Sequence, residues 1–249
     1  MIIIKTSEEI EKMRRVSRAV ADTLKGMEAM VRPGAKTRDL DRYAEESLRG
    51  RGVEPAFKGY RGYPNTICAS CNQVVVHGIP NDEELGEGDI LSVDLGGILD
   101  GYYGDSAVTF AVGEVSDEAR RLMKVASEAL ERGIDQARPG HRIYDISSAI
   151  QRHAEEEKFS VVRDYVGHGI GRNLHEDPQV PNFGKAGSGP RLKEGMVLAI
   201  EPMVNQGTWK VELQKDGWGV VTADGQLSAH FEHTVAIGES GPEVLTRWS

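Results

Sequence analysis

The stretch EGDILSVD, residues 87–94, recurs later in the chain as EGMVLAIE, residues 194–201. In both copies an apolar run predicts a buried strand that ends on a carboxylate, Asp94 in the first and Glu201 in the second. The offset between the copies is 107 residues (194 − 87). The tripeptide Arg-Pro-Gly also recurs, at 32–34 and 138–140, with an offset of 106 residues (138 − 32). Two echoes with nearly equal offset predict an internal repeat.

Each copy of the repeat predicts the same order of elements: helix, helix and then strand. Helices are expected at about 7–30, 37–48, 117–137 and 143–158. Strands are expected near 67–76, 90–95, 98–103, 106–112, 161–166, 196–204, 208–213, 218–222 and 230–237, with a turn at Gly96-Gly97. We therefore expect an α+β fold with two αβ halves, about 1–115 and 116–249, related by a pseudo-two-fold axis within one domain over 1–249.

The composition is that of a globular chain, with 39% hydrophobic and 28% charged residues. The formal net charge of −9 has the wrong sign for a general nucleic-acid binder. The start, Met1 to Lys5, has too few apolar residues for a signal peptide, and a cytoplasmic protein is expected. The two cysteines, Cys68 and Cys71, precede a strand-like run rather than opening a helix, which disfavours a thioredoxin-like redox site.

Four carboxylates lie inside or beside runs that predict buried strands: Asp94, Asp105, Glu201 and Glu232. Any one of them could be a strand-end acid that faces water. A buried carboxylate, however, costs several kcal/mol unless it is protonated, paired or bound to a metal. Clustered carboxylates also repel one another, and no lysine or arginine lies within these strand cores. A pair of divalent cations would neutralise the group.

Three histidines are candidates for the same site. His168 is flanked by Gly167 and Gly169, which would let the backbone approach closely and fix the imidazole as a nitrogen ligand. One imidazole with four carboxylates suits two divalent ions. We expect His175 at the rim of the cavity, donating to a substrate carbonyl, and His77 at the polar end of a strand. The other four, His141, His153, His230 and His233, are expected to be structural or surface residues.

Nearly the whole chain resembles the type I methionine aminopeptidases, whose pita-bread fold has a curved, mainly antiparallel sheet covered by helices. The resemblance lies in the ordered set His77-Gly78, Asp94, Asp105, His168, His175, Glu201 and Glu232, and in the motifs GYRGYP (59–64), VHGIP (76–80) and GHGIG (167–171). Only 25 residues (201 − 175 − 1) separate His175 from Glu201, where type II enzymes carry a long insertion. Prolidases and aminopeptidase P share the metal set but add an N-terminal domain.

By this resemblance, the reaction is removal of an N-terminal methionine when the second residue is small, by two-metal hydrolysis of the first peptide bond. The implied ligands of two divalent ions (cobalt, manganese, iron, zinc or nickel) are Asp94, Asp105, His168, Glu201 and Glu232, with Asp105 and Glu232 bridging. Glu201 would carry the proton, His175 stabilise the carbonyl oxygen and His77 position the amide. The methionine pocket falls on Tyr60, Tyr63, Cys68, His77 and Trp218. A monovalent-cation site would fall on Asn72, Val74 and Ser228. Leu174 replaces a residue that is often aromatic in the family.

Other classes of function stay open. A non-enzymatic binding module of this fold loses its metal ligands, whereas this chain keeps all five. A mononuclear iron oxygenase with two histidines and one carboxylate would leave three buried acids unexplained. A proline-specific peptidase is the nearest competitor among enzymes. The expected partners are the N-terminal methionine of nascent polypeptides and, as a second candidate, the ribosome. The chain is expected to be a monomer, with no membrane contact and no direct nucleic-acid specificity.

Overall fold

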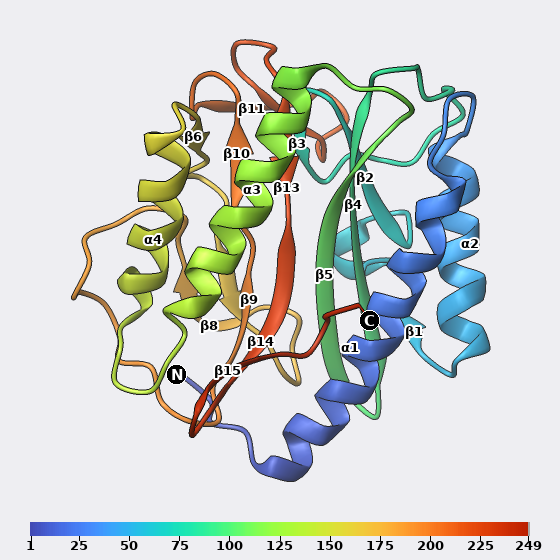
Figure 1. Cartoon of the computed structure of the whole chain (residues 1–249). Coiled ribbons are helices and arrows are strands. Elements are labelled where there is room, and N and C mark those ends of the chain that lie inside the picture. Colours follow the sequence, from blue (N-terminus) through green and yellow to red (C-terminus); the bar gives the residue numbers. More distant parts are fainter. Residues whose placement is uncertain (249) are drawn as a thin grey trace.

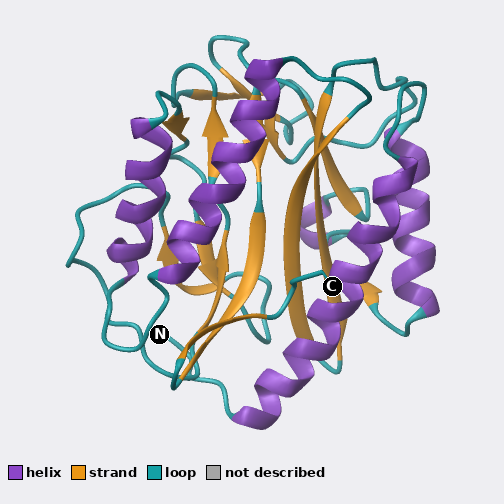
Figure 2. Ribbon diagram, in the orientation of Figure 1, coloured by secondary structure: helices purple, strands orange, loops and turns teal. Residues whose placement is uncertain are grey.

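The structure, a computed structural model, describes residues 1–248. Its main sheet has nine strands in the order β1-β4-β5-β14-β9-β7-β8, with β2 beside β4 and β15 beside β14. Every strand pair in this sheet is antiparallel. In Figures 1 and 2, α1 and α3 cross the near side of the sheet, and α2 and α4 flank them. The expected α+β class is confirmed.

The helices are α1 (Ser7–Met27), α2 (Thr37–Gly50), α3 (Asp117–Asp135) and α4 (Ile143–Glu156), with 3-10 turns η1 (Glu28–Met30) and η2 (Tyr60–Gly62). The strands of the first half are β1 (Glu54–Pro55), β2 (Ile67–Cys71), β3 (Val74–Val76), β4 (Ile90–Leu99) and β5 (Tyr102–Ala111). The remaining strands are β6 (Ser160–Val161), β7 (Gly167–Gly169), β8 (Glu176–Val180), β9 (Val197–Ile200), β10 (Met203–Asn205), β11 (Val211–Leu213), β12 (Val220–Thr222), β13 (Ser228–His230), β14 (Glu232–Gly238) and β15 (Gly241–Val244). Two smaller sheets have the orders β13-β10-β6 and β11-β12-β3.

Strands from both predicted halves meet at the centre of the main sheet. The first copy of the repeated stretch leads into β4, which pairs with β5, and the second contains β9, which pairs with β14. β5 and β14 then pair with each other, with Ala107 opposite Glu232 and Ser106 opposite His233. Figure 1 shows these two strands side by side in the middle of the molecule. One sheet therefore takes strands from both halves.

The four predicted helices are present, and side-chain hydrogen bonds cap the starts of α1 and α3. At α1, the Thr6 hydroxyl accepts from the Glu9 N–H (3.3 Å) and the Glu9 carboxylate accepts from the Thr6 N–H (3.0 Å), which completes a capping box. At α3, the Ser116 hydroxyl accepts from the Ala119 N–H. The buried stripe of α1 includes Val20, which packs in the core of the first half. None of these helices has an apolar stretch long enough to span a membrane within residues 1–248.

The prediction of a turn at Gly96-Gly97 is wrong. Both glycines lie inside β4, opposite Asp105 and Gly104, and the turn between β4 and β5 is at Asp100-Gly101, where both φ angles are positive. The glycines instead make room for neighbouring side chains. A Cβ on Gly97 would lie 2.7 Å from Cγ1 of Val53 and 3.1 Å from Cγ2 of Val20.

Other strand boundaries also differ from expectation. The run 67–76 divides at Asn72 and Gln73 into β2 and β3, and the run 196–204 divides at Glu201-Pro202 into β9 and β10. The run 161–166 yields only the two-residue β6, and 230–237 becomes β13 and β14. β7 and β8 were not expected, because GHG and EDPQV lack the alternation or β-branched content that predicts a strand.

The positions of the two cysteines do not fit a thioredoxin-like redox site. Cys68 and Cys71 are both free thiols in β2, three positions apart, and residues with odd separation on a strand point to opposite faces. The pair is therefore not arranged as a disulfide.

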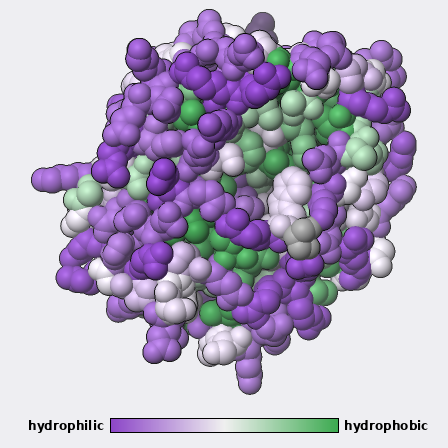
Figure 3. Space-filling view, viewed as in Figure 1, coloured by the Kyte–Doolittle hydropathy of each residue, from purple (hydrophilic) through white to green (hydrophobic). Residues whose placement is uncertain are grey.

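Figure 3 shows a mostly hydrophilic face, with apolar residues visible between the covering helices.

We predict that Gly97→Ala lowers the free energy of unfolding by about 1–3 kcal/mol, because the added methyl group overpacks the contact with Val53 and Val20. The matched control is Gly50→Ala at the end of α2, where an added Cβ meets nothing within 4 Å. That variant should change stability by no more than about 1 kcal/mol. Urea denaturation followed by circular dichroism measures both, and equal stability of the two variants would contradict the packing argument.

Candidate metal centre

Strand register places the predicted ligands on one face of the sheet. Asp94 lies opposite Ala107, and Ala107 lies opposite Glu232. Directly opposed residues share a face, and so do residues two apart on one strand, which adds Asp105 to the set. On the other side of β14, Thr234 lies opposite Ala199, and Ala199 lies opposite His168. Glu201 follows β9, two residues after Ala199. The five residues thus come from the neighbouring strands β4, β5, β14 and β7 and from the end of β9.

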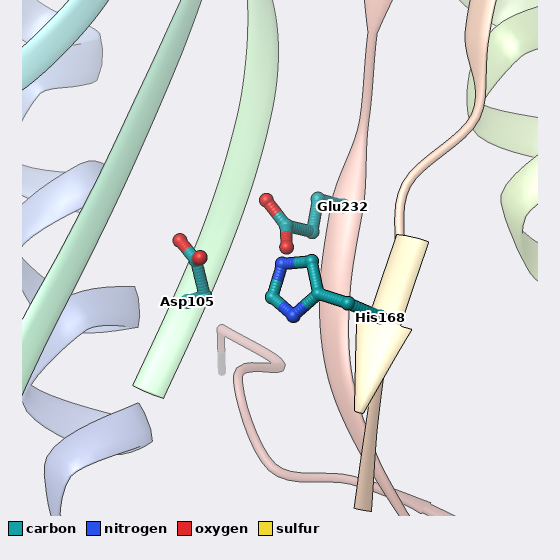
Figure 4. A group of neighbouring side chains, drawn as sticks. All are labelled: Asp105, His168 and Glu232. Carbon is teal, nitrogen blue, oxygen red and sulfur yellow. The ribbon is translucent and has the colours of Figure 1, made fainter. Parts of the chain in front are cut away.

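Three of these side chains point directly at one another. Ligand atoms of Asp105, His168 and Glu232 all lie within 4.8 Å of one another, and Figure 4 shows them converging from β5, β7 and β14. The exposed fractions of the three residues are 4%, 6% and 2%. His168 donates from Nδ1 to the carbonyl of Gly169 (3.0 Å), so its Nε2 keeps a free lone pair. That Nε2 lies 3.4 Å from Oε1 of Glu201.

The electrostatics of the cluster fit a divalent cation. Oδ1 of Asp94, Oδ1 of Asp105 and Oε1 of Glu232 are buried without a hydrogen-bond partner among residues 1–248. Burial raises the pKa of Asp94 to about 7. Burial and the neighbouring negative charges raise the pKa of Asp105, Glu201 and Glu232 well above the usual carboxyl range. Orphaned carboxylate oxygens beside one free imidazole nitrogen form the donor set that divalent ions prefer.

The glycines beside His168 have the role expected of them. β7 lies between β9 and β8. A Cβ on Gly167 would collide with the carbonyl of Ala199, and a Cβ on Gly169 would collide with the carbonyl of Asp177. Glycine at both positions therefore lets the backbone of β7 approach its neighbours closely enough to hold His168 among the carboxylates.

The cluster opens into a cavity of about 310 Å³. Its lining includes all five predicted ligands and every predicted substrate-binding residue: Tyr60, Tyr63, Cys68, His77, His175 and Trp218. Sequence reasoning did not assign Phe57, Arg61 or Tyr165, which also line it, and Leu174 is part of the wall.

One part of the cavity wall is apolar. The Tyr63 hydroxyl donates to the carbonyls of Ile67 (3.0 Å) and Gly78 (2.9 Å), and the rings of Tyr63 and Trp218 pack nearly perpendicular with 5.1 Å between centroids. Burial raises the pKa of the Cys68 thiol, which therefore stays protonated and neutral. These side chains suit an unbranched apolar group.

His77 and His175 reach the cavity as neutral imidazoles. Burial lowers the pKa of His77 to about 4 and also lowers the pKa of His175. Nδ1 of His175 lies 3.0 Å from the Tyr60 hydroxyl, and its ring centroid lies 4.3 Å from that of His168. The His77 ring packs against the ring of Tyr165 with 5.6 Å between centroids. A neutral imidazole offers one N–H that can donate to a substrate carbonyl and one nitrogen lone pair that can accept from an amide N–H.

His230 was expected to be structural or on the surface, and the structure places it beside the cluster. It is 1% exposed, and its Nε2 is 3.7 Å from Oε2 of Glu201, without a hydrogen-bond partner among the described residues. β13 ends at His230 and β14 begins at Glu232, so alternation along a single strand does not relate these two residues. By contrast, His153 and His233 contact Glu128 and Thr246, as expected of structural residues.

The residues proposed for a monovalent cation are partly adjacent. The carbonyl of Asn72, which has a φ of 54°, accepts from the Ser228 N–H at 2.9 Å. Val74 begins β3, two residues after Asn72.

Comparison with known proteins agrees with this geometry. The sequence model that describes metallopeptidase family M24 matches residues 11–239 of this chain. A methionine aminopeptidase of Clostridium acetobutylicum is 54% identical over 247 residues, covering 99% of both chains. Methionine aminopeptidase 1 of Bacillus subtilis is 51% identical and covers 99% of this chain and 100% of its own. The crystal structure of methionine aminopeptidase from Thermotoga maritima superposes with a TM-score of 0.98 at 49% identity, over 100% of both chains.

The chain therefore belongs to metallopeptidase family M24. Within that family it matches methionine aminopeptidases along almost its entire length, which confirms the resemblance inferred from the sequence. The prolidase of Pyrococcus furiosus also superposes, with a TM-score of 0.81 at 25% identity, but this chain covers only 66% of it.

We predict that Mn²⁺ or Co²⁺ raises the melting temperature of the metal-free protein, because the ion neutralises the buried carboxylates of the folded state alone. At 100 times the dissociation constant, the stabilisation should be about 2.7 kcal/mol. His168→Ala should lose most of the shift, whereas His175→Ala should keep it. Thermal unfolding with and without metal measures this, and equal loss in both variants would contradict the division of the two histidines.

Proposed function

We propose that this protein removes the N-terminal methionine of nascent proteins and peptides when the second residue is small, by two-metal hydrolysis of the first peptide bond. The observation that carries the proposal is the cavity itself. It is lined by the five residues predicted as metal ligands and by the apolar group Tyr63, Cys68 and Trp218. Methionine is unbranched and polarizable, which suits that wall.

In this proposal, two divalent ions of cobalt, manganese, iron, zinc or nickel would be held by Asp94, Asp105, His168, Glu201 and Glu232. Divalent ions held there would supply Lewis acidity toward water and the scissile carbonyl. The orphaned oxygens of Asp94, Asp105 and Glu232 support this assignment. A monovalent cation at Asn72, Val74 and Ser228 is proposed as an accessory site, supported by the contact between Asn72 and Ser228.

Glu201 is proposed as the proton carrier. Burial and the charge of Asp94 raise its pKa above that of an ordinary glutamate. A carboxylate at the floor of the cavity can take a proton from water and later deliver it to the leaving amine. The Asn182 side chain donates to the Glu201 carbonyl at 3.3 Å, which helps to hold this residue where β9 ends.

His175 and His77 are proposed to bind the reacting peptide bond. When the Tyr60 hydroxyl donates to Nδ1 of His175, the ring hydrogen is on Nε2, where it can donate to the carbonyl oxygen as negative charge develops. A donor of this kind is typically worth about 2.7–4 kcal/mol in the transition state. His77 would hold the amide next to it, with its ring supported by Tyr165.

The preference for a small second residue follows from crowding. With methionine in the apolar part of the cavity, the next side chain lies beside His77 and His175 and close to the carboxylates. A branched or long side chain would displace the peptide bond, and a displacement of about 1 Å can cost about 100-fold in rate.

We further propose that residues 1–249 act as one catalytic domain, because both halves contribute ligands to the same cluster. The chain is proposed to work as a cytoplasmic monomer on nascent polypeptides, for which the ribosome is a candidate partner.

We predict rapid cleavage of Met-Ala-Ser and at least about 100-fold slower cleavage of Met-Leu-Ser by the metal-loaded protein. Chromatographic detection of free methionine measures both rates. X-Pro dipeptides serve as the control for a prolidase activity. Equal rates for the two tripeptides would refute the crowding argument. Preferential cleavage of X-Pro would overturn the methionine specificity, and dioxygen consumption would indicate an oxygenase.

We also predict that Glu201→Gln reduces kcat by about 10²–10⁴-fold, because glutamine cannot carry the proton. Steady-state kinetics on Met-Ala-Ser, together with metal content by mass spectrometry, provides the measurement. The matched control is Glu194→Gln, at the first position of the repeated stretch, which is an exposed acid outside the cavity. Retention of more than about a tenth of wild-type kcat by Glu201→Gln would exclude it as the general base.

A further inference from the structure

A buried ion pair joins the N-terminal segment to the turn that carries His175. Nζ of Lys5 lies 2.7 Å from Oε2 of Glu176, and each side chain is only 3% exposed. Glu176 directly follows His175 in the sequence. Figure 1 shows the N-terminus near β8, and the terminal amine contacts Asp177 in that strand.

Both partners of this ion pair are themselves held in place. The Lys5 N–H donates to the carbonyl of Gly195 at 2.7 Å, at the start of the second copy of the repeated stretch. The other carboxylate oxygen of Glu176, Oε1, accepts from the Asn173 N–H at 3.1 Å. The backbone of Glu176 lies opposite Gly169 in the register of β7 and β8. The pair therefore ties the turn 170–176 to a second, independently anchored segment.

The turn presents two residues to the cavity. Leu174 is 3% exposed and forms part of the wall, and His175 contacts Tyr60 and His168. The Glu176 carboxylate closes the turn from its C-terminal side through the Asn173 N–H. One peptide unit joins Glu176 to His175, so the contacts of this carboxylate restrain the backbone next to His175.

We propose that Lys5 is a positioning residue for the reaction: its ion pair with Glu176 fixes the turn 170–176 and thereby holds His175 against the substrate carbonyl. This inference rests on the proposed function and on the role given to His175 in it. Lys5 touches neither the substrate nor the carboxylate cluster in this scheme, and its effect on catalysis acts through His175.

The alternative is that the pair only stabilises the fold. Thermodynamic coupling distinguishes the two, because a residue that acts through another has no further effect once that other residue is removed. Lys5→Met should lower kcat on Met-Ala-Ser by about 10- to 100-fold with KM nearly unchanged. In a His175→Ala background, the same substitution should lower kcat by less than about threefold.

Removal of one partner leaves a buried charge unpaired, which can unfold the protein. The deciding variant is therefore Lys5→Met with Glu176→Gln, which removes both charges at similar volume, and Lys5→Arg is the rescue variant that keeps the charge. Circular dichroism at the assay temperature confirms that each variant is folded. The matched control is Lys124→Met, which removes the exposed lysine facing Glu128 on α3, and its kcat should equal that of the wild type.

An unchanged kcat in the folded double variant, or equal losses in the wild-type and His175→Ala backgrounds, overturns the positioning role. If the wild-type protein itself does not cleave Met-Ala-Ser, the proposed function fails, and the positioning role fails with it. Activity in the wild type with additive losses in the variants refutes the positioning role alone.

Discussion

The main constraint on this structure is that four carboxylates are buried next to one another. Asp94, Asp105, Glu201 and Glu232 are drawn from neighbouring strands to a single face of the sheet. Removing such groups from water without compensation opposes folding, and their mutual repulsion adds to the cost. The rest of the sheet is apolar enough to sustain this, with fully buried strand residues such as Leu91, Leu198 and Val235 on either side. The cluster therefore destabilises the folded protein in a way that a bound divalent cation would relieve.

Much of this arrangement could be predicted from the sequence because it rests on periodic or local features. The repeated stretch identified Asp94 and Glu201 as equivalent, and an acid inside an apolar run is conspicuous on energetic grounds. Helix starts were equally readable, since Thr6 with Glu9 and Ser116 are capping residues whose hydrogen bonds span three positions.

Features set by distant packing were not predictable in this way. Gly96 and Gly97 look like a turn in sequence, and only the contacts of Val20, Val53 and Phe57 against β4 show why the chain stays extended there. His230 was taken as structural because its proximity to Glu201 depends on how β13, β14 and the end of β9 are assembled. The Lys5–Glu176 pair joins residues 171 positions apart, and no local pattern could have connected them.

The pairing of β5 with β14 has a consequence for biosynthesis. Asp105 and Glu232 belong to different halves and are separated by 127 positions (232 − 105), yet their side chains must meet before the cluster exists. A chain still emerging from the ribosome has no complete ligand set until its final strands have been made, and contacts between distant segments form slowly. The capacity to hold a metal is thus delayed to the end of synthesis. A product terminated before position 232 would lack Glu232, and so would carry no complete ligand set into the cell.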